Sequence, residues 1–176
     1  MTDFIEFDPV DDIAAGAFGL PGQRTFVIQA RKGSAVLSVL VEKEQVRLLA
    51  VEAQQFLDRI AEEEPEEPPS AVEVDGGAVR EDEPLFRARL IGIGYDAERG
   101  LVLIELREDA AAEEDDEDPP PPPDEAEGRI ARLYATRAQI RVMMRNGVTA
   151  VEGGRPNCPL CDFPMNPDGH ICPRWN

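Results

Sequence analysis

Apolar and polar positions follow two patterns in the first half of this chain, one typical of strands and one typical of a helix. Residues 25–30 (TFVIQA) and 35–42 (AVLSVLVE) are rich in apolar and β-branched side chains, and a short Lys-Gly turn separates them. Apolar residues then recur at helical spacing from Val46 to Ile60. The first half is therefore expected to form a hairpin followed by an amphipathic helix.

The second half shows the same order of patterns. Residues 87–96 and 101–107 predict two strands, and residues 129–135 predict a third. A helix is expected to follow, because Thr136 can act as its N-cap and Gln139 stands three positions later, as in a capping box. The apolar side chains of Ile140, Met143 and Met144 are expected to face the core. Gly147 is expected to end the helix at the C′ position.

The two halves can be aligned with each other. Residues 26–31 match residues 102–107, and residues 45–49 match residues 139–143 at an offset that is 18 residues larger, because the second half carries an insertion at 108–127. We predict an α+β fold in which two degenerate β-β-β-α repeats share one largely antiparallel sheet, followed by a C-terminal zinc knuckle. The alternative is that two apolar hairpins resemble each other by chance.

The net charge of −18 is concentrated in two segments of the chain. Residues 62–69 hold five acids and residues 108–127 hold eleven, with no basic residue in either, so the rest of the chain is nearly neutral. Segments rich in acid and proline bury too little apolar surface to fold, so we expect disorder at about 62–84 and 108–127. The predicted organisation is an α+β repeat domain at 1–150 and a zinc-knuckle tail at 151–176.

The sequence does not suggest a membrane protein or an exported one. It contains no run of 18 apolar residues, and its acidic N-terminus lacks the pattern of a signal peptide. We therefore expect a cytoplasmic location without a membrane partner. In the cytoplasm thiols stay reduced, and clustered cysteines bind metal more often than they form disulfides.

All three cysteines and the only histidine lie within fifteen residues near the C-terminus. These residues are Cys158, Cys161, His170 and Cys172, and together they supply the four ligands of a structural Zn²⁺ site. The spacing between His170 and Cys172 is a single residue, which in an extended strand would point both side chains to the same face. The alternatives are three reduced cysteines without a metal, or a Cys-x-x-Cys redox pair.

Several motifs carry a resemblance to a known family. The segments GLPGQRTFVIQA (19–30), VLVEKEQV (39–46), GRPNCPLC (154–161) and GHIC (169–172) resemble an actinobacterial family catalogued as domain of unknown function 3090. The resemblance covers nearly the whole chain and implies a cytoplasmic actinobacterial protein whose cysteine cluster is a family feature. It implies no activity. The acidic insertion and the short C-terminal end depart from the family pattern without touching the four candidate ligands.

Two other motifs contribute little to the predicted function. A G-x-G-x-x-A sequence at 92–97 is rejected as a nucleotide site, because the residues that follow predict a strand and not a helix. Arg137, Arg141 and Arg145 would form one stripe of the second helix, either as a solvated face or as an anion-binding surface.

These observations favour a non-enzymatic protein. A metal that binds His170 leaves no histidine for a catalytic triad. We predict a cytoplasmic binding or adaptor module for another protein, with a structural zinc site. The alternatives are an enzyme with a cleft between the two repeats, or a nucleic-acid binder that uses the arginine-rich region 128–176.

Overall fold

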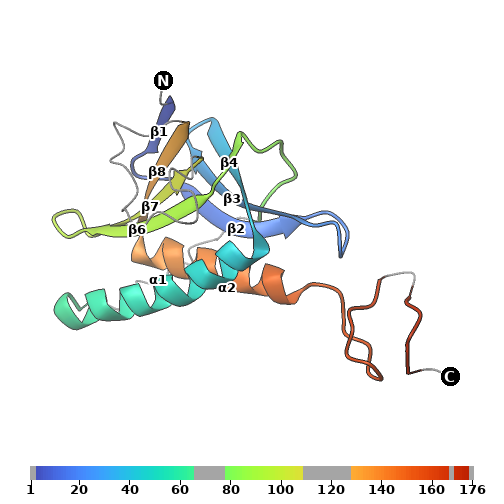
Figure 1. Cartoon of the computed structure of the whole chain (residues 1–176). Coiled ribbons are helices and arrows are strands. Elements are labelled where there is room, and N and C mark those ends of the chain that lie inside the picture. The colour runs from blue at the N-terminus through green and yellow to red at the C-terminus, as the bar shows by residue number, and fades with distance from the viewer. Residues whose placement is uncertain (1–2, 66–77, 109–127, 167–168, 175–176) are drawn as a thin grey trace, which may run out of the picture.

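The computed structural model describes residues 3–65, 78–108, 128–166 and 169–174 of the chain (Figure 1). Neither of the helices in these residues is long and apolar enough to cross a membrane. The elements are β1 (Asp3–Phe7), β2 (Asp12–Phe18), β3 (Thr25–Lys32), β4 (Ala35–Val41), α1 (Lys43–Glu63), β5 (Phe86–Arg87), β6 (Leu90–Asp96), β7 (Leu101–Arg107), β8 (Arg129–Thr136) and α2 (Arg137–Glu152).

The strands form two four-stranded sheets, so the expectation of one shared sheet was wrong. One sheet has the order β2-β3-β4-β5 and the other has the order β1-β8-β7-β6. In each sheet three consecutive strands are antiparallel, and the fourth is a parallel strand that comes from the other half of the chain. These parallel strands, β1 and β5, each form one edge of their sheet. The predicted α+β class is confirmed.

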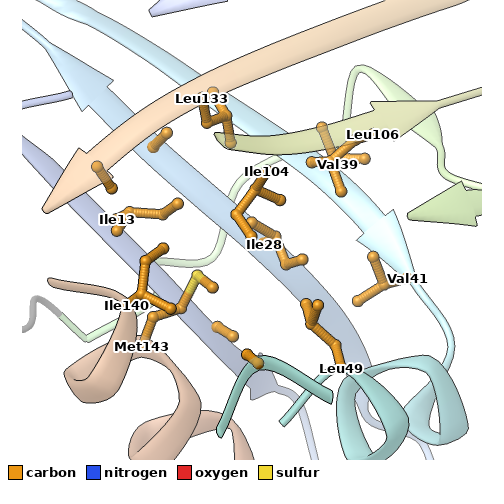
Figure 2. Close-up of a cluster of buried hydrophobic side chains, with 14 of the residues drawn as sticks. Ile13, Ile28, Val39, Val41, Leu49, Ile104, Leu106, Leu133, Ile140 and Met143 are labelled. Carbon is orange, nitrogen blue, oxygen red and sulfur yellow. The ribbon is translucent and has the colours of Figure 1, made fainter. Parts of the chain in front are cut away.

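The two sheets and the two helices enclose a single apolar core (Figure 2). Along β7 the buried side chains alternate with less buried ones, as expected for a strand that turns one face to the core. The helices lie side by side against the sheets and pack against each other (Figure 1). Side chains from both sheets and both helices meet in this core, among them Ile28, Val39, Leu49, Ile104, Leu133, Ile140 and Met143.

The aligned glutamines occupy equivalent places in the two halves. Gln45 and Gln139 are both the third residue of their helices, and each accepts a hydrogen bond from the backbone N–H of the N-cap, at 2.8 and 2.9 Å. Each glutamine also donates a hydrogen bond to a backbone carbonyl that lies just before a hairpin. Gln45 donates to Ala88, before β6, and Gln139 donates to Asp11, before β2. In the described residues each half runs β-β-β-β-α, one strand more than expected, and the repeat itself stays a prediction.

The predicted hairpins and helices are present, two N-terminal strands were missed, and the strand expected at 87–96 is divided into β5 and β6. The hairpin β3–β4 and the strands β7 and β8 match the expected ranges within a few residues. The missed strands are β1, which is short, and β2, whose sequence DIAAGAF has a single β-branched side chain, Ile13. They are recognisable only through their pairing with β8 and β3.

The structure describes only the ends of the two acidic segments that were predicted to be disordered. Residues 66–77 and 109–127 lie outside the described residues, and α1 extends to Glu63. Before β5 the chain crosses the β2–β3 face, where the Gln29 side chain exchanges two hydrogen bonds with the backbone of Arg80, both near 2.8 Å. Val79 lies directly over Gly16, where a Cβ atom would stand 2.9 Å from Val79 Cγ2. This contact explains how both faces of β3 are buried.

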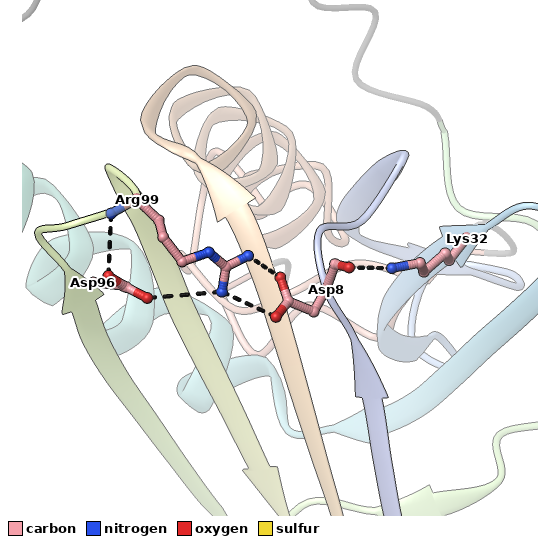
Figure 3. A network of polar contacts seen from close by, with 4 residues as sticks. All are labelled: Asp8, Lys32, Asp96 and Arg99. Carbon is pink, nitrogen blue, oxygen red and sulfur yellow. Dashed lines mark hydrogen bonds and ion pairs between the residues drawn. The ribbon is translucent and has the colours of Figure 1, made fainter.

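A polar network joins the ends of the two sheets (Figure 3). The Arg99 guanidinium, from the β6–β7 turn, donates to both carboxylate oxygens of Asp8 and lies 3.7 Å from Asp96. The Asp8 carbonyl in turn accepts a hydrogen bond from Lys32 at the end of β3. The hydrogen bonds from Arg99 lower the pKa of the Asp8 carboxyl group.

Gly147 does not end α2, which continues to Glu152. Gly147 is buried where α2 crosses α1 and β2, and a Cβ atom there would lie 2.9 Å from Val46 Cγ1 and 3.3 Å from Ala15 Cβ. The glycine is needed for a close approach between elements rather than for a left-handed turn. The N-terminal prediction for this helix is confirmed, since Thr136 and Gln139 form the capping box.

We expect Gly147→Ala to destabilise the protein by about 1 kcal/mol. Alanine gains about 1 kcal/mol of helix propensity, but forcing a methyl group against Val46 costs about 1–3 kcal/mol because a valine in a helix has one strongly preferred rotamer. Chemical denaturation measures the difference. Gly92→Ala, whose new Cβ would meet only an ordinary contact at 3.8 Å, is the matched control and is expected to be nearly neutral. A variant at 147 as stable as the parent would contradict this account of the helix crossing.

Candidate metal centre

The residues after α2 form a short hairpin whose turn carries the first two cysteines. The N–H of Cys158 donates to the carbonyl of Phe163, and the N–H of Met165 donates to that of Pro156, each at 2.8 Å. At the turn Asp162 adopts a left-handed conformation, with φ of 62°, and its N–H donates to the carbonyl of Cys158. This turn points Cys158 and Cys161 the same way, as a metal knuckle requires.

The third and fourth candidate ligands reach the same point from the end of the chain. Ile171, between His170 and Cys172, is 97% exposed, whereas both of its neighbours turn toward the cysteines of the knuckle. This is the alternation expected for a one-residue spacer in extended chain. The histidine and the last cysteine therefore complete a group of four.

The four ligand atoms converge on a common centre. All of them lie within 4.8 Å of one another, with 3.9 Å between Cys158 Sγ and Cys172 Sγ and 3.2 Å between Cys161 Sγ and His170 Nε2. Two sulfurs bound tetrahedrally to zinc at about 2.3 Å stand about 3.8 Å apart. Cys158 and Cys172 are buried, and Cys161 and His170 are half-buried. This cluster could hold a metal ion.

Backbone groups of the knuckle favour a thiolate at its first cysteine. Hydrogen bonds from the backbone at Leu160 and Cys161 lower the pKa of the Cys158 thiol. Desolvation raises the pKa of the Cys161 thiol. The cysteine spacing alone does not reveal these N–H donors, which depend on the fold of the turn.

Two arginines stand on either side of the four candidate ligands in the sequence. Arg174 donates to the carbonyl of Leu160 inside the knuckle at 3.1 Å, and Arg155 donates to Asn166 at 2.7 Å. The Arg155 side chain also lies against Gly22, where a Cβ atom would stand 3.3 Å from it. Arg155 therefore connects the tail to the turn before β3, and the tail lies beside the end of α2 (Figure 1).

The structure separates the three arginines that were expected to form one stripe. Arg141 and Arg145 are exposed, but Arg137 is only 7% exposed. The Arg137 guanidinium donates to the carbonyl and the carboxylate of Glu64, at 2.7 and 3.2 Å, and to the Tyr95 hydroxyl. Arg137 thus joins the end of α1 to β6 and does not contribute to an anion-binding face. A three-arginine surface is not formed.

We expect Arg137→Gln to lower the free energy of unfolding by about 2 kcal/mol. The reason is that buried, charge-assisted hydrogen bonds to Glu64 and Tyr95 are lost together. The exposed Arg141, changed to Gln in the same way, should cost less than about 0.5 kcal/mol. Thermal and denaturant unfolding compare the two. Equal effects would mean that the contacts of Arg137 add nothing to stability.

The glycines of the 92–97 motif and Arg24 have structural roles. Gly92 and Gly94 lie in β6, and a strand follows, so the rejection of a nucleotide loop there agrees with the structure. Arg24 caps the C-terminal end of α2, because it donates to the carbonyls of Ala150 and Gly153 at 2.8 and 3.0 Å.

Fold and site together define a small α+β protein with two sheets and a C-terminal Cys₃His cluster able to hold a metal ion. The chain belongs to the family described as "Protein of unknown function (DUF3090)", whose model matches residues 5–172 and so includes all four candidate ligands. This confirms the resemblance found in the sequence. Neither the curated proteins nor the solved structures contain a match to the chain.

Proposed function

We propose that the cluster binds one structural Zn²⁺ and that the chain is a non-enzymatic cytoplasmic binding module for another protein. The observation that carries the proposal is the convergence of Cys158, Cys161, His170 and Cys172 on one centre. Three thiolates and one imidazole match the preference of zinc for sulfur and nitrogen ligands in a tetrahedron. A site with four protein ligands leaves no position for a substrate, which favours a structural role.

A structural metal also accounts for the order of the tail. The core cluster of buried apolar residues ends, within the described residues, at α2 and includes none from the knuckle. A segment without an apolar core needs another source of folding free energy, and metal binding supplies it in small domains. The tail should therefore depend on the metal, whereas the two sheets should not.

The zinc hypothesis predicts one zinc ion per chain and none in Cys161→Ser. Elemental analysis of the purified protein measures the metal, and Co²⁺ substitution should give the absorption of a tetrahedral thiolate site. In the variant, hydrogen exchange should rise in residues 155–172 while the amides of β3 and β7 keep their protection, because the sheets have their own core. Metal-free protein with an ordered tail would refute the proposal, and loss of protection in the sheets would show that the tail packs into the main domain.

Exposed apolar side chains around the cluster support the binding role. Leu160 is 51% exposed, Phe163 is 61% exposed, and Ile171 is almost fully exposed, and all three lie in the tail. The metal would hold them in a fixed arrangement that needs little ordering on binding. Large apolar side chains gathered in this way are typical of a protein-binding surface.

The binding role predicts that replacing Leu160, Phe163 and Ile171 by serine abolishes capture of a partner without loss of the metal. The chain is used as bait in cytoplasmic extract, and a captured protein is then purified and titrated against both forms by calorimetry. The matched control replaces Leu20 and Val36, which are equally exposed but lie outside the tail. A purified partner that binds the triple variant as tightly as the parent would contradict the role of this surface.

A further inference from the structure

A cavity of about 440 Å³ lies where β3 begins and β4 passes into α1. Three basic side chains line it, Arg24, Lys43 and Arg87, against one acid, Glu42. Apolar walls include Phe26 and Val41. The volume falls within the usual range for small-molecule sites. The cavity is separate from the metal cluster and from any residue assigned a function above, apart from the cap formed by Arg24.

The charges of the cavity do not cancel. The Glu42 carboxylate accepts a hydrogen bond from Arg87, so this pair is neutral as a unit. Arg24 and Lys43 remain, and among the described residues neither forms an ion pair with an acid. A hollow with an excess of two positive charges stands out in a chain whose net charge is −18. Such a local field attracts small anions.

Arg24 is held in place for this task. Its Nη1 donates to two carbonyl groups at the end of α2, which fixes the orientation of the guanidinium. Arg24 therefore offers the cavity a positive charge in a fixed position.

Lys43 provides a second, more mobile charge at the same place. It is the first residue of α1, so its ammonium group and the positive end of the helix dipole act on the same region. Its Nζ extends toward the root of the tail, where a Cβ atom on Gly154 would stand 3.5 Å from it. The position lets Lys43 reach an anion without breaking an existing ion pair.

We propose that this cavity binds a small molecule that carries an oxyanion, a phosphate or carboxylate group, on an apolar body. The guanidinium of Arg24 and the ammonium of Lys43 bind the oxyanion through charge-assisted hydrogen bonds, and the Arg87–Glu42 pair borders it. The apolar body contacts the Phe26 side of the cavity. The proposal does not depend on zinc or on a protein partner.

The two lysines of the chain, Lys32 and Lys43, provide a sharp test. Reductive methylation with ¹³C keeps their charge and gives each a separate NMR signal. Titration with phenyl phosphate or benzoate should shift the Lys43 signal with saturation and leave Lys32 unchanged. Benzyl alcohol, which has the ring without the charge, should shift neither. Whichever of the two anions binds with higher affinity identifies the charged group, phosphate or carboxylate, that the cavity prefers.

Variants extend the test to affinity. Lys43→Gln should weaken phenyl phosphate binding about tenfold or more in calorimetry, as expected for the loss of a charge-assisted contact. Lys32→Gln is the matched control and should bind like the parent. Arg24 is left unchanged because it also caps α2. Equal shifts at both lysines, binding of benzyl alcohol, or unchanged affinity in the Lys43 variant would overturn the proposal.

Discussion

The exchange of edge strands between the two halves of the chain is the constraint on which the rest of the fold depends. β1 precedes the first hairpin but pairs with β8, and β5 precedes the second hairpin group but pairs with β4. Each sheet is therefore completed by the other half, and both sheets contribute to one apolar core. Because neither half covers its own edge or its own core, the two must fold together.

The second helix shows how this shared core determines individual side chains. α2 can lie close to α1 and β2 only because Gly147 has no side chain at the crossing. Its C-terminal carbonyls are capped by Arg24, which is distant in sequence, since the last turn of α2 contains no basic residue. At its N-terminal end Arg137 satisfies groups of α1 and β6. Polar groups at both ends of the helix thus act as tertiary contacts.

The tail is built differently from the two sheets. Its described residues add nothing to the apolar core, and its backbone forms only a short hairpin and a few turns. The four candidate ligand atoms converge in this segment, which has few other contacts to hold it together. The cavity lies near the end of α2, where the tail begins. Arg24 caps α2 and also brings a positive charge to this cavity, which apolar residues line as well.

The sequence by itself determined the local elements and the candidate ligands. Apolar periodicity located most strands and both helices, the Thr136–Gln139 spacing predicted a capping box, and the clustering of Cys158, Cys161, His170 and Cys172 predicted the four candidate ligands that the structure brings together. Only the tertiary structure decided the division into two sheets, the burial of Arg137 and the role of Gly147. Periodicity reflects which face of an element is buried. It does not specify the partner that covers this face, because that choice depends on contacts between residues far apart in the chain.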